Sequence, residues 1–220
     1  MKVFPTNLTT DSRDIIKLQL LSLLLFKGQA SPFYKNLIET HYAKTFSPLQ
    51  GYLTFSKNSC FVIGACEIDS SLSEKEFDDV ITKTLNQVLT EGFDERRIQG
   101  ILNEVQFSYK QIKSRFSLNS ILTIEYGLIL MQSMIESWTH HADPSFCLLS
   151  EAQLEAISKE GVNKVMKEMI RKYLLPTSTQ NGVKKVIIRE DNKYFEKMVC
   201  FFGIPFIIES TRRSQSEETC

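Results

Sequence analysis

Tyr52-Leu53-Thr54-Phe55 and Phe61-Val62-Ile63-Gly64-Ala65-Cys66 are the two runs from which the fold of this chain can be predicted. Both are rich in aromatic and β-branched residues, and the period of their apolar residues is two. Ser56-Lys57-Asn58-Ser59 stands between them and has the composition of a turn. We therefore expect an antiparallel β-hairpin over these residues.

The apolar period changes to that of a helix directly after the hairpin. Ser73 and Glu76 form an S-x-x-E capping box, and the helix they begin is expected to end at Gly92. A short helix over 31–40 is expected upstream, with Ser31 as its cap and Pro32 at its first position. The remaining predicted elements are helices over 11–27, from Asp94 onward, 119–140, 150–159 and 161–175, and a strand over 183–189.

The order helix, hairpin, several helices and returning strand predicts an α+β fold. We expect a two-layer sandwich in which a mostly antiparallel sheet carries several helices on one face. Residues 1–10 are expected to be irregular because Pro5 interrupts them, and 11–198 to form one domain. The end of the chain, 199–220, shows no recognisable pattern and is expected to be a divergent, disordered tail.

Composition excludes several classes of protein. The 26 basic and 26 acidic residues balance, which argues against a nucleic-acid partner. Five widely spaced cysteines without a C-x-x-C motif favour free thiols in a reducing compartment. The apolar runs 18–26 and 199–208 are too short to predict a membrane span, and no signal or transit peptide is visible at the start of the sequence.

Five ordered matches identify a family. The segment 28–39 resembles the G-P-x-S-P-F-Y-x-x-L-I-E stretch of the mitochondrial presequence proteases, which are pitrilysin-type metallopeptidases. The other matches are 46–52 to F-S-P-x-x-G-Y, 91–98 to G-F-x-x-x-R-I, 138–144 to W-N-H-D-G-D-P, and 191–194 to D-D-K-Y. The resemblance covers about 14–197 and departs at Ala142, which replaces a glycine, and at His141, which replaces an acid.

The resemblance implies a place in a larger enzyme. In that family four homologous α+β domains enclose a chamber, and this chain is similar to most of the second domain. Zinc in the full-length family is held by an H-x-x-E-H motif, in which two imidazoles bind the metal and the glutamate activates water. His41, His140 and His141 do not have that spacing, so we expect no catalytic residue, no metal ligand and no cofactor in this chain. The resemblance also implies the mitochondrial matrix, with the targeting information outside this sequence.

Two other kinds of site can be drawn from the sequence and are not favoured. His140, His141, Asp143 and Cys147 could form a metal cluster, but adjacent histidines on a helix point about 100° apart. The preferred interpretation is a helix end stopped at Asp143-Pro144. Cys60 and Cys66 could be nucleophiles, but their strand parity favours small core residues.

The hairpin is the candidate binding site. An edge strand leaves backbone groups unpaired, and an extended peptide can add to it as a further strand. Gly51, Tyr52 and Thr54 are the candidate peptide-binding residues, since glycine permits close approach and tyrosine offers amphipathic contact. The alternative, which stays open, is that Tyr52 packs under the helices.

Three hypotheses about function follow. In the first, the chain is a non-catalytic part of a zinc metalloendopeptidase that degrades mitochondrial presequences and other short unfolded peptides, and it contributes chamber wall and substrate anchoring. In the second, it is a stand-alone peptide-binding or scaffold protein whose exposed apolar surface is covered by a partner or by self-association. In the third, the sequence comes from an incomplete gene model and has no independent function. The expected partners are unfolded peptides, together with the missing catalytic and second-half domains or a second copy of the chain.

Overall fold

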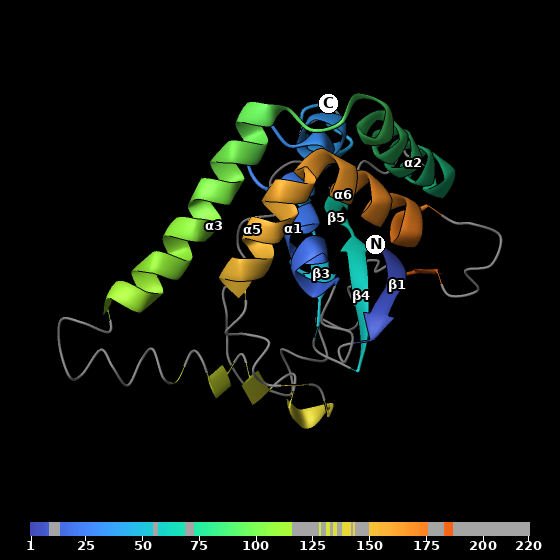
Figure 1. Ribbon diagram of the computed structural model, residues 1–220. Helices are drawn as coiled ribbons and strands as arrows, with labels where there is room; N and C mark the ends of the chain where they lie inside the picture. The colour runs from blue at the N-terminus through green and yellow to red at the C-terminus, as the bar shows by residue number, and fades with distance from the viewer. Residues whose placement is uncertain are drawn as a thin grey trace, which may run out of the picture. The chain divides into compact units, whose positions relative to one another are not determined.

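The structure is a computed structural model that describes residues 1–8, 14–54, 57–68, 73–115, parts of 128–143, 150–175 and 183–186. All of these lie in one compact unit, Met1–Val186. Its helices gather on one side of an antiparallel sheet (Figure 1), so the predicted α+β sandwich is confirmed. Every helix in the described part is too short or too polar to cross a membrane.

The sheet has four strands in the order β3-β4-β1-β6, and all three pairings are antiparallel. These strands are β1 (Lys2–Leu8), β3 (Gly51–Leu53), β4 (Asn58–Ile63) and β6 (Lys184–Lys185). β2 (Ala43–Phe46) pairs with β5 (Ala65–Ile68), which follows β4 directly after Gly64. The predicted hairpin is therefore confirmed as β3 and β4, and the predicted returning strand is present as β6. Asn58 and Ser59, expected in the turn, begin β4, and the expected strand over 61–66 is divided at Gly64 between β4 and β5.

The expectation of an irregular N-terminus is wrong. β1 is an inner strand that pairs with β4 on one side and β6 on the other. Pro5 stands opposite Cys60, and the register shifts between Pro5 and Leu8. A bulge is one of the places where a strand tolerates a residue without an N–H, so Pro5 does not end the strand. Phe4, 1% exposed, anchors β1 in the core.

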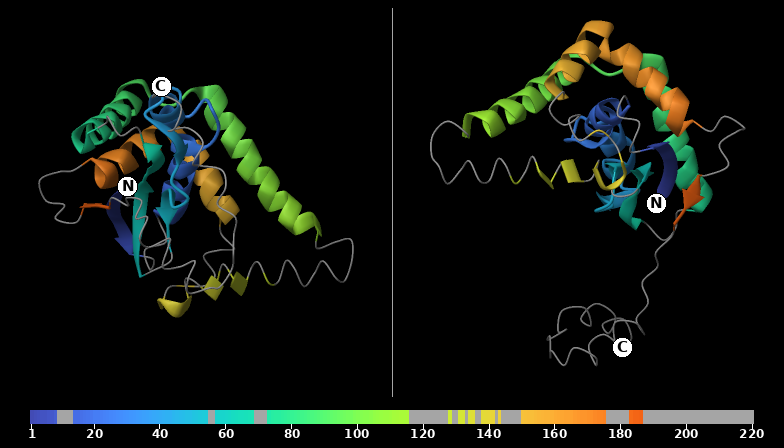
Figure 2. Two further views of the ribbon diagram at one scale, coloured as in Figure 1. Left: turned by 180° about the vertical axis from the view of Figure 1, so that it is seen from behind. Right: turned by 60° about the horizontal axis from the view of Figure 1, so that its bottom comes forward.

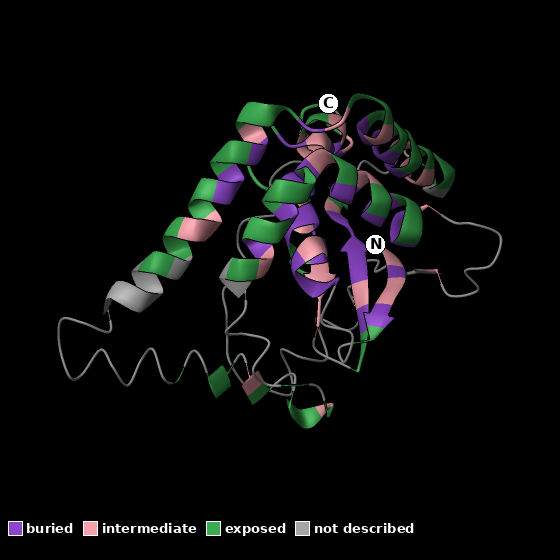
Figure 3. Ribbon diagram, in the orientation of Figure 1, coloured by how far each residue is buried: buried purple, intermediate pink, exposed green. Residues whose placement is uncertain are grey.

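Helix α1 (Ile15–Phe26) is the centre of the core. Eight of its residues are buried: Ile15, Ile16, Leu18, Leu20, Leu21, Leu24, Leu25 and Phe26. It contacts β3 on one side and α3, α5 and α6 on the other, so it lies between the sheet and the outer helices (Figure 2). This position explains why its apolar residues go almost all the way round, as expected for a helix buried on several sides. Figure 3 shows the resulting concentration of buried residues in α1 and β4.

The outer helices begin and end close to the predicted positions. They are α2 (Glu74–Glu91), α3 (Glu95–Arg115), α5 (Ser150–Glu160), α6 (Val162–Met169) and the π-helical turn η3 (Ile170–Leu174). The capping box of α2 is complete: Ser73 N donates to Glu76 Oε2 at 2.7 Å, and Glu76 N donates to Ser73 Oγ at 3.3 Å. Gly92 ends α2 with a φ of 80°, which glycine adopts without strain. Pro32 begins a short helix that continues as the π-helical turn η1 (Tyr34–Ile38), and Ser31 Oγ accepts from Tyr34 N at 3.3 Å.

Three predictions fall wholly or partly outside the described residues. Most of the expected helix over 119–140, the match at 191–194 and the tail 199–220 lie there. The domain boundary at 198 therefore stays a prediction.

Candidate peptide-binding edge

Strand β3 lies at one edge of the four-stranded sheet. Within the described part of the chain its partner is β4, with Gly51 opposite Val62, Tyr52 opposite Phe61 and Leu53 opposite Cys60. A strand paired on one side directs half of its backbone N–H and C=O groups away from its neighbour. The geometry is that of a strand to which an extended peptide can add.

Gly51 is fixed by its backbone and by helix α1. Its φ is 84°, a left-handed conformation that side chains other than glycine adopt at a cost. A Cβ at this position would lie 2.0 Å from Ser22 Oγ of α1. Glycine at the start of β3 thus allows the edge strand to run against α1, and this contact gives the residue a structural role as well as the predicted binding role.

Tyr52 is half-buried and packs against the apolar core. Its hydroxyl donates to Asn7 Oδ1 of β1 at 2.9 Å. Burial raises the pKa of Tyr52 to about 12, so the phenol stays protonated and keeps this hydrogen bond. Thr54, also half-buried, follows the last residue of β3. The three candidate residues therefore lie in sequence along one edge, and Tyr52 is held to the sheet at its tip.

An ionic cluster around the buried Asp14 side chain lies at the start of α1 and was not predicted. Asp14 accepts from Lys172 Nζ at 2.6 Å and from Tyr173 Oη at 2.8 Å, and Lys17 Nζ is 3.5 Å away. Burial acts to raise the pKa of Asp14, but the hydrogen bonds from Lys172 and Tyr173 outweigh it, and the pKa lies below its usual value. The cluster ties η3 to α1 across 158 residues of sequence, and no local pattern signals such a pair.

The histidines do not form a metal site with their neighbours in the described residues. Among these residues no group of three or more His, Cys, Asp or Glu side chains could hold a metal ion. His141 lies in a turn in which its N–H donates to Trp138 O at 3.0 Å, as expected for a helix end. Cys147 lies outside the described residues. The part of the chain described here therefore does not fit a zinc centre.

Cys60 and Cys66 are free thiols and are half-buried. Burial raises the pKa of the Cys60 thiol, which lowers the fraction of reactive thiolate at neutral pH. This environment is that of a packed strand residue rather than an activated nucleophile.

The chain is similar to curated presequence proteases. It is 29% identical over 192 residues to the mitochondrial presequence protease of Mus musculus, which covers 86% of this chain and 17% of that protein. It is 29% identical over 178 residues to that of Schizosaccharomyces pombe, covering 80% of this chain and 17% of the relative. It is 33% identical over 135 residues to that of Xenopus laevis, which covers 61% of this chain and 12% of the relative. The chain thus spans about a sixth of the length of the relatives it matches.

The fold has solved counterparts. The inactive peptidase domain of a protein classed as a zinc protease from Bordetella parapertussis matches with a TM-score of 0.62 and 13% identity, over 87% of this chain and 92% of that one. A zinc protease of the same class from Bordetella pertussis matches with a TM-score of 0.59. No protein-family model matches the sequence. The expected resemblance is nevertheless confirmed: most of this chain is similar to part of the mitochondrial presequence proteases, and its α+β fold matches that of a zinc protease peptidase domain.

Proposed function

We propose that this chain is a non-catalytic domain of a zinc metalloendopeptidase that degrades mitochondrial presequences and other short unfolded peptides. It contributes a wall of the chamber and anchors the substrate, and it works in the mitochondrial matrix. The 220 residues of this sequence contain no H-x-x-E-H motif. The zinc of such a peptidase would therefore be bound by residues outside this sequence. In this role the chain supplies no catalytic residue.

The observation that carries the anchoring role is the position of β3 at the edge of the sheet. Backbone hydrogen bonds give such binding its affinity without requiring one sequence, which suits a domain that handles many unfolded peptides. Gly51 brings the strand close to α1, and Tyr52 is held by Asn7, so the edge is ordered before a peptide arrives. An ordered edge loses less conformational entropy on binding.

N-methylated peptides test the anchoring role directly. A fluorescent presequence-like peptide is compared with two N-methylated versions. One version is methylated on the backbone nitrogens of its odd-numbered residues, and the other on those of its even-numbered residues. Because successive N–H groups of a strand point to opposite sides, the version methylated toward β3 should lose most of its binding, and the other version should keep it. Equal binding by both versions, measured as fluorescence anisotropy, would show that the peptide does not add to the sheet.

Hydrolysis of the same peptide by the purified chain, with and without added zinc, tests the non-catalytic role. We expect no cleavage and no stoichiometric zinc by metal analysis. Zinc-dependent cleavage would contradict the proposal and return attention to His140, His141, Asp143 and Cys147.

The second candidate is a stand-alone peptide-binding or scaffold protein on the same fold. The exposed apolar side chains Leu128, Met131 and Trp138, which are 63%, 58% and 68% exposed, favour a covering partner or self-association. Sedimentation of the purified chain distinguishes the two: a stable oligomer that binds peptide on its own supports the scaffold.

A further inference from the structure

A groove of about 950 Å³ lies beside η1 and the β2–β5 pair, away from the residues assigned to the β3 edge. Its apolar lining comes from Tyr34 and Ile38 of η1, Ala43 of β2 and Ile68 of β5. The groove is open to solvent, and its volume lies in the range found for ligand pockets. Ile68 is 39% exposed, so the apolar lining is accessible.

The π-helical turn brings Tyr34 and Glu39 to the same groove. Glu39 N donates to Tyr34 O at 3.0 Å, the i to i+5 bond that defines this turn. In an α-helix, residues i and i+5 lie on different faces. The wider π-turn brings residue i+5 close to the same face as residue i. Such turns are frequent at functional sites, and here the result is an aromatic ring and a carboxylate lining one groove.

The ring of Tyr34 is held in position by a series of aromatic contacts. It meets Phe46 edge-on, with ring centroids 6.4 Å apart and an interplanar angle of 61°. Phe46 in turn meets Phe26 of α1 edge-on at 5.6 Å, and Phe26 stacks on Phe33 at 5.1 Å. Phe33 is fully buried, whereas Tyr34 is half-buried and lines the groove.

The charges at the groove favour a cationic ligand. Lys44 pairs with Glu67 across the β2–β5 strands at 2.9 Å, so the groove's lysine already has a counter-charge. Glu39 is exposed, and no ion pair engages it among the described residues. An exposed carboxylate beside a fixed tyrosine ring suits a guanidinium group, which can form an ion pair with the carboxylate and stack on the ring.

We infer that this groove receives an arginine side chain of a bound peptide, with the guanidinium against Tyr34 and Glu39 and a neighbouring apolar residue against Ile38 and Ile68. The inference rests on the proposed function for the nature of the ligand, since presequences are amphipathic, rich in arginine and poor in acidic residues. It adds a side-chain preference to the backbone binding at β3. The groove thereby selects basic, amphipathic peptides from other unfolded chains.

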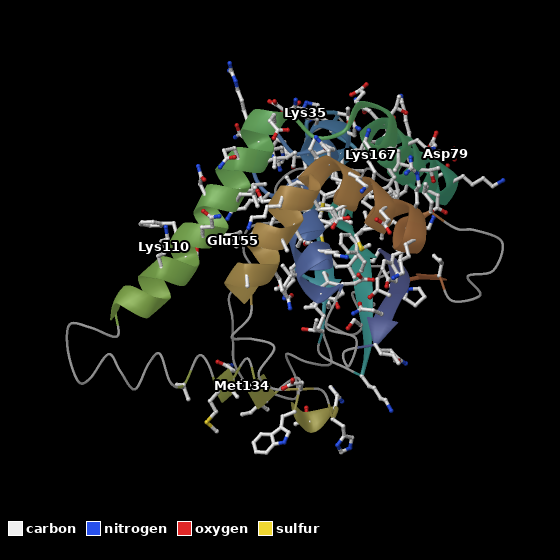
Figure 4. The ribbon with its side chains drawn as sticks, viewed as in Figure 1. Lys35, Asp79, Lys110, Met134, Glu155 and Lys167 are labelled. Atoms are coloured by element: carbon white, nitrogen blue, oxygen red, sulfur yellow. The ribbon has the colours of Figure 1, made fainter. Side chains whose placement is uncertain are left out.

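Paired peptides that differ in one charge test the inference. A fluorescent peptide with a single arginine is compared with the same peptide carrying citrulline, which keeps the shape and removes the charge. We expect the intact chain to bind the arginine peptide roughly five- to tenfold more tightly, the size that one exposed ion pair and one cation–π contact allow. Glu39→Gln and Tyr34→Leu should each reduce that preference, while Glu155→Gln, which removes an exposed carboxylate on α5 (Figure 4), should leave it unchanged.

The outcomes separate this inference from the proposed function. If the Glu39→Gln variant kept the preference for arginine, the assignment of the groove as the arginine site would be wrong. Peptide binding at β3 would be unaffected by that result. If the wild-type chain binds no presequence-like peptide, the proposed function fails, and the groove is then decided by an NMR titration with blocked Ile-Arg dipeptide. Shifts of the Tyr34 and Glu39 amides would support the groove, and unchanged amides would overturn it.

Discussion

The side chain of Asn163 on α6 bonds both backbone groups of Phe93. Its Nδ2 donates to Phe93 O at 3.0 Å, and its Oδ1 accepts from Phe93 N at 2.7 Å. Phe93 lies in the connection between α2 and α3, 70 residues away in the sequence. A second contact supports the same junction, since Lys167 Nζ donates to Thr90 O at 3.2 Å. Segment 91–98, one of the matches to the presequence proteases, is therefore held in place by helix α6, which lies about 70 residues further along the sequence.

Replacing Asn163 should loosen this connection. We expect Asn163→Ala to lower the free energy of unfolding by about 1–3 kcal/mol, because two backbone groups of a half-buried turn lose their partner. Asn163→Asp should also destabilise, since a carboxylate would face the Phe93 carbonyl. Urea unfolding measures both variants, and Asn86→Ala on the exposed side of α2 is the control. Unchanged hydrogen exchange at the Phe93 amide would contradict this role.

Arg97 closes the C-terminal end of α1. Its guanidinium donates to Leu24 O at 2.9 Å and 3.2 Å, to Lys27 O at 2.6 Å and to Leu23 O at 3.4 Å. Helix-end carbonyls have no partner within the helix, and the flat fork of arginine reaches several at once. We expect Arg97→Lys to cost about 1.5–3 kcal/mol of stability, as for hydrogen bonds to a charged group.

The neighbouring Arg96 offers a matched control for Arg97. It is exposed on the same helix, so Arg96→Lys should change the unfolding free energy by less than about 0.5 kcal/mol. Equal effects of the two substitutions, measured by urea unfolding, would show that the carbonyl contacts of Arg97 contribute nothing.

Gly51→Ala should destabilise the β3 edge for two separable reasons. The left-handed φ costs about 1 kcal/mol or more for alanine, and the new Cβ would overlap Ser22 Oγ. Ser22→Ala removes the overlapping oxygen and should recover part of the loss in the double variant. A thermodynamic cycle from thermal unfolding measures the coupling. Additive effects would mean that the strand moves away from α1 to avoid the contact.

Acid should weaken the attachment of η3 to α1. The pKa of Asp14 is lowered in the folded chain below its ordinary value of 3.8, despite the opposing effect of burial, by the hydrogen bonds from Lys172 and Tyr173. A lowered carboxyl pKa contributes stability that is present above the unfolded value and is lost as the pH falls through the folded value.

Asp14→Asn tests this acid dependence. The difference in unfolding free energy between wild type and variant should be constant above about pH 5 and shrink below about pH 4. Asp79→Asn, an exposed carboxylate on α2, is the control (Figure 4). A difference independent of pH would show that the charge of Asp14 does not stabilise the fold.

Much of the local structure could be predicted from the sequence because its signals act within a few residues. The Ser73–Glu76 box, the glycine that ends α2 and the hairpin of β3 and β4 each depend on neighbouring residues, and all are confirmed. The N-terminal strand was missed because Pro5 outweighs a short apolar pattern, whereas in the sheet it stands next to a bulge. The short helix over 31–40 was predicted without its π-turn, because apolar spacing does not reveal an i to i+5 hydrogen bond.

The sequence by itself determined the α+β class, the capped helices, the hairpin and the relation to the presequence proteases, since these follow from periodicity and ordered motifs along the chain. The tertiary structure decided which strand is the edge, which carboxylate pairs with Lys172, and which aromatic ring faces a groove. Those features depend on contacts between separate elements of the fold, such as that between Asp14 and Lys172, 158 positions apart. Their energies come from packing and desolvation, which no local pattern encodes.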